Sequence, residues 1–174
     1  MKKLLIVVDY QIDFINGALG FPGAENLAPI IAAKIDKYHN EGNDVAFTLD
    51  THGEDYLGTS EGKHLPVPHC IRYSDGHKLW PEIEKYKSPD DRTFEKPTFG
   101  SAELFDFLRN SEYGSVELCG LVTDICVVSN AILAKTALPE AEIIVDASAT
   151  DSFDKAKYEA ALAVMESVQI TVLR

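Results

Sequence analysis

Apolar and polar residues follow one another along the chain in runs that predict strands and helices in turn. The continuous apolar run Leu4–Val8 is typical of a strand that is covered on both faces of a sheet. Between Asn26 and Asn40 apolar residues recur at helical spacing, and Asn26 is the expected N-cap. The same two patterns continue to the last residues. Further strands are expected at 45–49, 93–95, 115–119, 143–145 and 170–173, and further helices at 101–108, 123–137 and 154–165, the first of them capped by Ser101.

The alternation of strands with helices indicates a parallel sheet with helices on both faces. Because crossovers between parallel strands are right-handed, few topologies remain, and we expect a three-layer α/β/α, doubly wound, mostly parallel sheet of the Rossmann-like type. No repeat or linker divides the 174 residues, so a single domain over 1–174 is expected. The segment 50–91 has little periodicity, contains four prolines and the only tryptophan, and is long enough to indicate a functional loop.

Composition and charge narrow the classes of function. Hydrophobic residues make up 45% of the chain and charged residues 25%, as in a soluble globular protein, and no apolar run is long enough to cross a bilayer. The net charge of −12 disfavours nucleic acid and anionic membranes as partners. Cys70, Cys119 and Cys126 match no disulfide framework or zinc knuckle, so we expect reduced thiols and a cytoplasmic location.

Reactive side chains follow the ends of four predicted strands. Asp9 and Asp50 end the first two strands. Lys96 follows the third strand, and Cys126 comes just after the fourth, in the first turn of a helix. Since ligands bind outside the carboxyl ends of the strands in an open α/β sheet, these groups are expected to meet in one cleft. A helix N-terminus and a nearby ammonium group stabilise a thiolate, which predicts a cysteine nucleophile.

The residues alone leave alternatives for each of these roles. An aspartate at the place of Asp9 can act as a general base, and Asp13 is a second candidate in the same loop. Cys126 could instead be a buried helix residue, while Cys119 lies inside a strand and is expected in the core. A lysine is most often an exposed surface residue, and only the position of Lys96 after a predicted strand indicates a functional role.

A second group of polar residues predicts a metal site. Asp50 and His52 lie two positions apart at a strand end and could face one ion, and His69 could complete a mononuclear site with water in the open positions. Mixed nitrogen and oxygen ligands suit zinc, iron or manganese better than calcium. Glu61 and His64 lie between these residues in the sequence. The alternative is a polar loop with solvated histidines.

Taken together, these motifs resemble the isochorismatase-like cysteine hydrolases, and among them the nicotinamidases most. The resemblance extends over essentially the whole chain. Each motif is weak alone, whereas five in order at strand ends are highly specific. They are VDYQIDF at 8–14, TLDTH at 48–52, EGKHLPVPHC at 61–70, FEKPTFGS at 94–101 and GLVTDIC at 120–126.

The resemblance implies a catalytic triad of Asp9, Lys96 and Cys126. It also implies a cis peptide bond between Leu121 and Val122, which would aim the N–H of Val122, together with that of Cys126, at an oxyanion. In nicotinamidases the motif aspartate and histidines bind a metal ion that anchors the pyridine nitrogen of the substrate. The resemblance therefore implies a cysteine hydrolase that carries one divalent metal ion, with zinc expected and iron or manganese as alternatives.

For the metal ion, the resemblance implies Asp50, His52 and His69 as ligands. Relatives use either a glutamate or a further histidine as the fourth ligand, and Glu61 matches the glutamate version while His64 is its competitor. The residues that would line the substrate pocket are Phe14, Leu19 and Trp80.

By resemblance, the chain is expected to form a homo-oligomer and to hydrolyse a small-molecule amide, nicotinamide in particular, through a thioester. Amidases that act on carbamoyl or ureido compounds are the first alternative. An isochorismatase is another, although such relatives need no metal anchor. A non-catalytic small-molecule-binding domain on the same sheet is the third, but neither G-x-G-x-x-G nor a Walker sequence follows the first strand.

Overall fold

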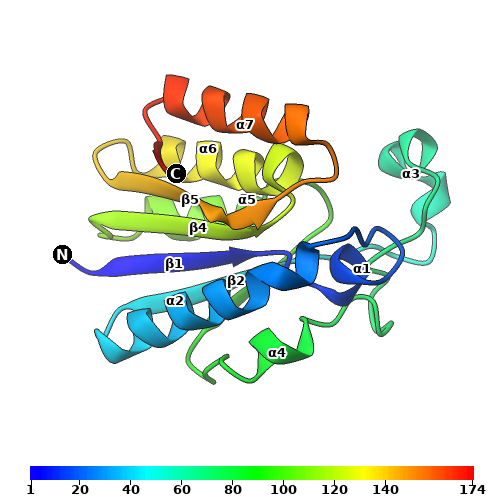
Figure 1. Cartoon of the computed structure of the whole chain (residues 1–174), viewed down its shortest axis with the longest axis horizontal. Coiled ribbons are helices and arrows are strands. Elements are labelled where there is room, and N and C mark those ends of the chain that lie inside the picture. The colour runs from blue at the N-terminus through cyan, green and yellow to red at the C-terminus, as the bar shows by residue number, and fades with distance from the viewer.

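A six-stranded parallel sheet forms the centre of the computed structural model, which describes residues 1–174 (Figure 1). The strands lie in the order β3-β2-β1-β4-β5-β6, so the predicted doubly wound fold is confirmed. Their bounds are β1 (Lys3–Val8), β2 (Asp44–Asp50), β3 (Arg92–Lys96), β4 (Ser115–Leu121), β5 (Glu142–Asp151) and β6 (Thr171–Leu173).

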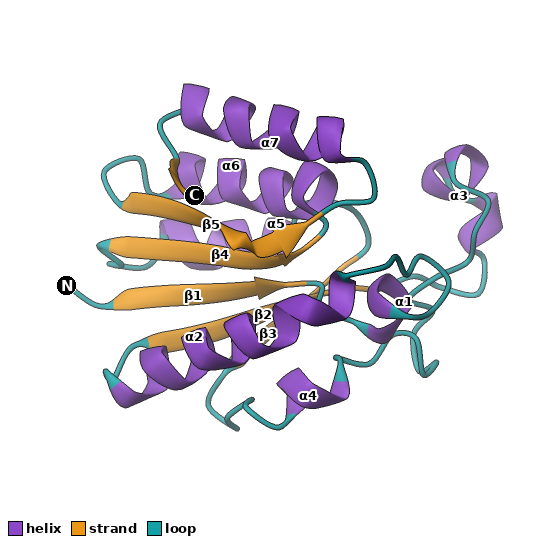
Figure 2. Cartoon of the chain, viewed as in Figure 1, coloured by secondary structure: helices purple, strands orange, loops and turns teal.

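Helices cover both faces of this sheet (Figure 2). One face carries α2 (Ala28–Asn40) and α4 (Pro81–Glu84), and the other carries α5 (Ala102–Arg109), α6 (Val128–Ala137) and α7 (Lys155–Ser167). None of these helices combines the length and the apolar character that a membrane crossing requires. The shorter helical segments are α1 (Ile12–Ile15), η1 (Ala24–Leu27), η2 (Tyr56–Gly58), α3 (Ser60–His64) and η3 (Thr123–Val127).

The alternating side chains of β1 divide between two hydrophobic cores. Leu5 and Val7 belong to the core beneath α2, while Leu4, Ile6 and Val8 belong to the core beneath α5, α6 and α7. All five side chains are buried, and burying one such side chain stabilises the fold by about 1.5–3 kcal/mol. The apolar run has no polar interruption because both faces of β1 are covered.

The strand order reverses between β1 and β4, and this reversal places the functional cleft. From β1 the chain moves outward through β2 and β3, whereas from β4 it moves the other way through β5 and β6. Connections that diverge in this way leave a crevice at the carboxyl ends of the two central strands. Gly120 lets β4 approach β1 there, because a Cβ on it would lie 2.1 Å from the carbonyl oxygen of Val8.

One of the two predicted helix N-caps is present in the structure. Ser101 caps α5 as predicted, since its Oγ accepts from the N–H of Leu104 at 3.1 Å. The prediction that Asn26 caps α2 was wrong. Asn26 lies in the turn η1, where its N–H donates to the carbonyl of Gly23, and α2 begins at Ala28 without a side-chain cap.

Two other predicted boundaries differ near the cleft. The helix expected from Thr123 opens with a wide π-helical turn, in which the N–H of Val127 donates to the carbonyl of Val122 at 3.1 Å. The strand expected to end at Val145 continues to Asp151 after a shift of register against β4. Both irregularities lie where β4 and β5 approach the cleft, and a regular hydrophobic pattern does not reveal them.

An ion cluster beneath α2 joins this helix to the sheet. Lys34 Nζ lies 2.6 Å from Glu117 Oε1 and 2.6 Å from Asp146 Oδ2. The Tyr38 hydroxyl donates to Glu117 Oε2 at 2.8 Å. Burial alone would lower the pKa of Lys34, but the hydrogen bonds to Asp146 and Glu117 raise it above its usual value. A single ammonium group therefore forms ion pairs with two largely buried carboxylates.

Replacing Lys34 by methionine is expected to lower the free energy of unfolding by about 3–5 kcal/mol, because the two carboxylates would be left without a cation. Lys37→Met, on the exposed side of the same helix, is the matched control and should change stability by less than about 0.5 kcal/mol. Urea denaturation at neutral pH measures both variants. Equal stabilities for the two variants would contradict this account of the cluster.

Candidate active site

Three reactive side chains meet at the carboxyl edge of the sheet. Asp9 follows β1, Lys96 ends β3, and Cys126 lies in the π-helical turn after β4. Lys96 Nζ lies 2.6 Å from Asp9 Oδ2 and donates to Cys126 Sγ at 3.5 Å. All three side chains are buried. The structure thus brings together the residues that the sequence suggests as a triad.

Lys96 contacts a second carboxylate as well as the triad. Its Nζ donates to Asp50 Oδ1 at 3.1 Å and to the carbonyl oxygen of Thr98 at 3.0 Å. Burial alone would lower the pKa of Lys96, but the neighbouring negative charges, that of Asp9 first, raise it well above its usual value. Lys96 is therefore a permanent cation between two buried carboxylates.

Thr48 orients the Asp9 carboxylate, a role that the sequence did not suggest. The Thr48 hydroxyl donates to Asp9 Oδ1 at 2.6 Å, and it accepts from the Asp9 N–H at 3.2 Å. Thr48 pairs with Val8 between β2 and β1, so the strand register was the signal that could have found it. Burial raises the pKa of Asp9 although Lys96 lowers it, which makes Asp9 a better proton acceptor than an exposed aspartate.

Burial and two neighbouring charges set the proton affinity of the Cys126 thiol. Burial raises the pKa of Cys126 well above its usual value, and the charge of Asp9 raises it further, while Lys96 acts in the opposite direction. The sequence suggested that a nearby lysine stabilises the thiolate, and Lys96 Nζ does lie 3.5 Å from the sulfur. Because the thiol has a raised pKa, a base that takes its proton is needed before the sulfur can attack.

Four potential metal ligands lie beside the triad. Asp50 Oδ2 is 2.9 Å from His52 Nε2 and 3.2 Å from His69 Nε2. Glu61 Oε1 is 3.6 Å and 3.7 Å from the same two nitrogen atoms. The ligand atoms of all four residues lie within 4.8 Å of one another. Two imidazoles and two carboxylates fit a zinc, iron or manganese ion.

A hydrogen bond determines which nitrogen of His69 faces this group. The Nδ1 of His69 contacts the carbonyl oxygen of Val67 at 2.8 Å. Since a carbonyl only accepts, Nδ1 carries the hydrogen and Nε2 is left for a metal. His64 is not among the residues whose ligand atoms gather within 4.8 Å of one another, and its Nδ1 contacts the carbonyl oxygen of Ser60 in its own helix. Of the two candidates for the fourth ligand, the structure therefore favours Glu61 over His64.

A cavity of about 320 Å³ opens onto both the triad and the potential metal ligands. Phe14 and Leu19 line it, as the resemblance implies. Trp80 does not, and its assignment to this pocket is corrected: its backbone N–H donates to the carbonyl of Tyr10 directly before α4, and its side chain borders a separate cavity. The remaining lining residues are Asp50, Glu61, Leu65, His69, Phe99, Val122, Ile125, Cys126 and Phe153.

Four apolar residues that line this cavity were not predicted from the sequence. Phe99 lies three residues after Lys96, and Ile125 directly precedes Cys126. Phe153 follows the end of β5, so the longer strand would have pointed to it. The fourth missed wall is Leu65. The peptide bond between Leu121 and Val122, which borders the same cavity, is cis, as the resemblance implies.

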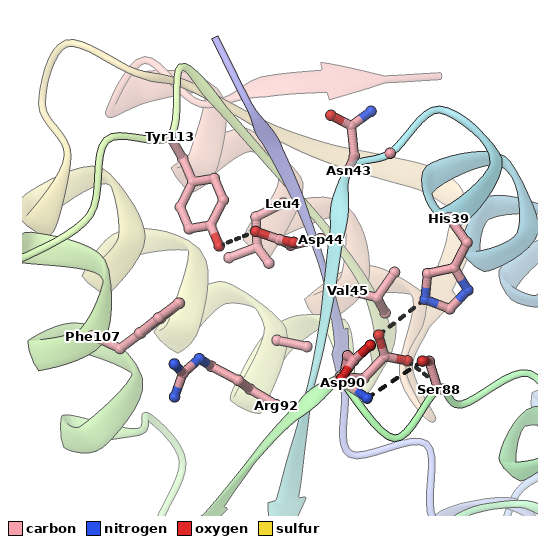
Figure 3. Close-up of a pocket in the computed structure, with 13 residues that line it drawn as sticks. Leu4, His39, Asn43, Asp44, Val45, Ser88, Asp90, Arg92, Phe107 and Tyr113 are labelled. Atoms are coloured by element: carbon pink, nitrogen blue, oxygen red, sulfur yellow. Dashed lines mark hydrogen bonds and ion pairs between the residues drawn. The ribbon is translucent and has the colours of Figure 1, made fainter.

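Another cavity, of about 660 Å³, lies at the opposite edge of the sheet, beside the first residues of β1, β2 and β3 (Figure 3). Two of its carboxylates are held by neighbouring side chains: Tyr113 donates to Asp44 at 2.6 Å, and His39 Nε2 is 2.9 Å from Asp91. No cysteine lines it, and its residues form no cluster of metal ligands. The chemistry therefore concentrates at the carboxyl edge.

The chain is similar to known proteins over almost its whole length. A family model described as Isochorismatase domain matches residues 3–174. Nicotinamidase/pyrazinamidase of Mycobacterium tuberculosis is 28% identical over 171 residues, which cover 87% of this chain and 89% of that protein. Among solved structures, the nicotinamidase/pyrazinamidase PncA of Bacillus subtilis is 30% identical with a TM-score of 0.85, and 100% of each chain is covered. The pyrazinamidase of Pyrococcus horikoshii in complex with zinc is 26% identical with a TM-score of 0.87, covering 100% of this chain and 99% of that one.

Proposed function

The chain belongs to the isochorismatase family and is an amide hydrolase, and from this premise we propose that it is a cysteine-dependent, metal-containing nicotinamidase. The reaction would convert nicotinamide and water into nicotinate and ammonia. The observation that carries the proposal is that one small apolar cavity is lined both by Cys126 and by the potential metal ligands Asp50, Glu61 and His69. A flat heteroaromatic amide needs this combination of an apolar slot, a nucleophile at one end and a polar anchor at the other.

The first half of the reaction is acylation of Cys126. Asp9 accepts the thiol proton, and Lys96 stabilises the resulting thiolate. The sulfur attacks the amide carbonyl carbon, and the backbone N–H groups of Val122 and Cys126 hold the oxyanion. The carbon–nitrogen bond then breaks, and ammonia leaves with the proton that Asp9 returns. The product of this half is a thioester on Cys126.

The second half is hydrolysis of that thioester. Asp9, now unprotonated, takes a proton from a water molecule, whose oxygen attacks the thioester carbonyl carbon. The carbon–sulfur bond breaks and the acid is released, and Asp9 passes its proton to the departing sulfur, which restores the thiol and the Asp9 carboxylate. Asp50, His52, Glu61 and His69 would hold the metal ion, which supplies a Lewis-acidic partner for the ring nitrogen of the substrate. The four residues would thus serve to hold an ion for orienting the substrate, while the proton transfers belong to Asp9.

The proposal predicts that zinc-loaded protein releases ammonia from nicotinamide, and that removal of the metal lowers kcat/KM by at least about tenfold, which is about 1.4 kcal/mol of transition-state stabilisation. Benzamide, which has no ring nitrogen, is the matched substrate. It should react slowly, and metal removal should change its rate by less than about twofold. An ammonia assay on both substrates, before and after chelation and after zinc is restored, measures this difference.

Two results would change the proposal in different ways. No ammonia from nicotinamide with folded, metal-loaded protein would remove this substrate, and carbamoyl and ureido compounds would be tested next. Equal losses for nicotinamide and benzamide on chelation would contradict the role of the metal as an anchor for the ring nitrogen, because benzamide offers it nothing to bind.

A further inference from the structure

Gln11 takes no part in the proposed chemistry, although it lies in the same motif as Asp9. Its side chain is completely buried. Nε2 donates to the carbonyl oxygen of Asp50 at 2.9 Å and to that of His77 at 2.8 Å. Oε1 accepts from the N–H of Asp50 at 2.8 Å. Both donors of the amide are therefore used, and a single side chain satisfies the two backbone polar groups of Asp50.

This arrangement imitates one residue of a neighbouring strand. In a sheet, the N–H and the carbonyl of a residue are held by an adjacent strand. At Asp50 the strand β2 ends, and the Gln11 amide supplies both partners. Hydrogen bonds to both the N–H and the carbonyl of Asp50 fix its backbone conformation. The backbone conformation in turn sets the direction in which the Asp50 side chain points.

The direction of this side chain matters because each of its oxygens has a separate function. Asp50 Oδ2 faces the two histidines of the metal group, at 2.9 and 3.2 Å. Asp50 Oδ1 accepts from Lys96 at 3.1 Å. Groups that orient the ligands of a metal contribute strongly to its affinity, and a carboxylate shared between two functions tolerates little displacement.

We propose that Gln11 is a positioning residue, which sets the Asp50 carboxylate for metal binding. The inference rests on the metal site of the proposed function. Gln11 does not line the substrate cavity, so its effect has to pass through Asp50. Metal affinity is therefore the quantity that it controls most directly.

The chain offers a matched control in Asn130. This amide is also completely buried, and it too makes three hydrogen bonds to backbone groups. Its Oδ1 accepts from the N–H of Ser101 at 3.0 Å, and its Nδ2 donates to the carbonyls of Phe99 at 3.1 Å and Cys126 at 2.8 Å. Asn130 contacts none of the potential metal ligands, so replacing it removes similar bonds without reaching Asp50.

The test compares Gln11→Glu, Gln11→Met and Asn130→Asp with the unchanged protein, in a titration of metal-free protein with Co²⁺ followed by its visible absorption. Circular dichroism and urea denaturation establish that each variant is folded before titration. We expect the dissociation constant for Co²⁺ to rise about 10–100-fold in both Gln11 variants, the range typical for the loss of a group that orients a ligand. In Asn130→Asp it should change by less than about threefold, by the same reasoning.

The possible results distinguish an error in the role of Gln11 from an error in the proposed metal site. Folded Gln11 variants that bind Co²⁺ within about twofold of the unchanged protein would overturn it and leave the proposed function intact. Loss of fold in both Gln11 variants while Asn130→Asp stays folded would overturn it too, because Gln11 would then be a determinant of folding. Failure of the unchanged protein to bind Co²⁺ would instead remove the metal site itself.

Discussion

Cys126→Ala is expected to lower the turnover of nicotinamide by at least about 10⁴-fold while the protein stays folded. Without the sulfur, no covalent intermediate forms, and the remaining site can only orient a water molecule. The cost in stability should be about 1 kcal/mol, because one buried atom is removed and the neighbouring side chains stay in place. Ammonia release under single-turnover and steady-state conditions measures the first effect, and urea denaturation measures the second.

Cys119→Ala is the control for this variant. Cys119 is also buried, but it lies inside β4 and its side chain belongs to the core beneath α2. Its loss should cost a similar free energy of unfolding and leave turnover within about twofold. If Cys126→Ala kept near-normal turnover, covalent catalysis would have to be abandoned, whatever the identity of the substrate.

Lys96→Met should have the second largest effect, because it acts on stability and on catalysis together. In the metal-free protein it leaves the carboxylates of Asp9 and Asp50 buried without their cation, at a cost of about 3–5 kcal/mol. It also removes the group that stabilises the Cys126 thiolate, so turnover should fall by about 10²-fold or more.

The stability loss in Lys96→Met should be larger at high pH than at low pH. Burial raises the pKa of Asp9 above its unfolded value of 3.8, and Lys96 opposes this effect. Without Lys96, the pKa of Asp9 in the folded state rises further. A carboxyl group with a raised folded pKa binds a proton more readily when folded, so the penalty is largest at high pH and shrinks as the pH falls through the raised pKa.

Urea denaturation of metal-free protein at pH 8 and pH 5 tests this dependence. Lys85→Met, at an exposed position after α4, corrects for the loss of one positive charge from an acidic protein. The difference in stability between the two variants should be smaller at the lower pH. A difference that stays constant would indicate that Asp9 does not take up the proton when its cation is lost.

The elements with strong periodicity were predictable from the sequence. The apolar run of β1 has no interruption because both faces of this strand are buried. The apolar residues of α2 recur at helical spacing because only one face of this helix is buried. The N-cap at Ser101 was also predictable, because a hydroxyl there satisfies a free N–H. The turn η1 and the register shift in β5 were not, since backbone hydrogen bonds and contacts between strands decide them.

The positions of the reactive groups were predictable for a related reason. Parallel strands place their carboxyl ends at one edge, so Asp9, Lys96 and Cys126 could be expected to meet. The environment that sets their proton affinities could not be expected. Thr48 and Gln11 act through side-chain contacts with residues 39 positions away, and the sequence pattern carries no trace of such contacts.

The site is distributed over four strands, so it forms only after these four strands have paired. The residues at 9, 50, 96 and 126 meet only when β3, β2, β1 and β4 have all paired, and the chain between the first and the last of these residues contains most of the molecule. Contacts between residues so far apart in sequence form late during refolding, because long loops have to close first. Helices can therefore form early in refolding, before the chain regains activity. A fragment that ends before Cys126 lacks one of the four site residues.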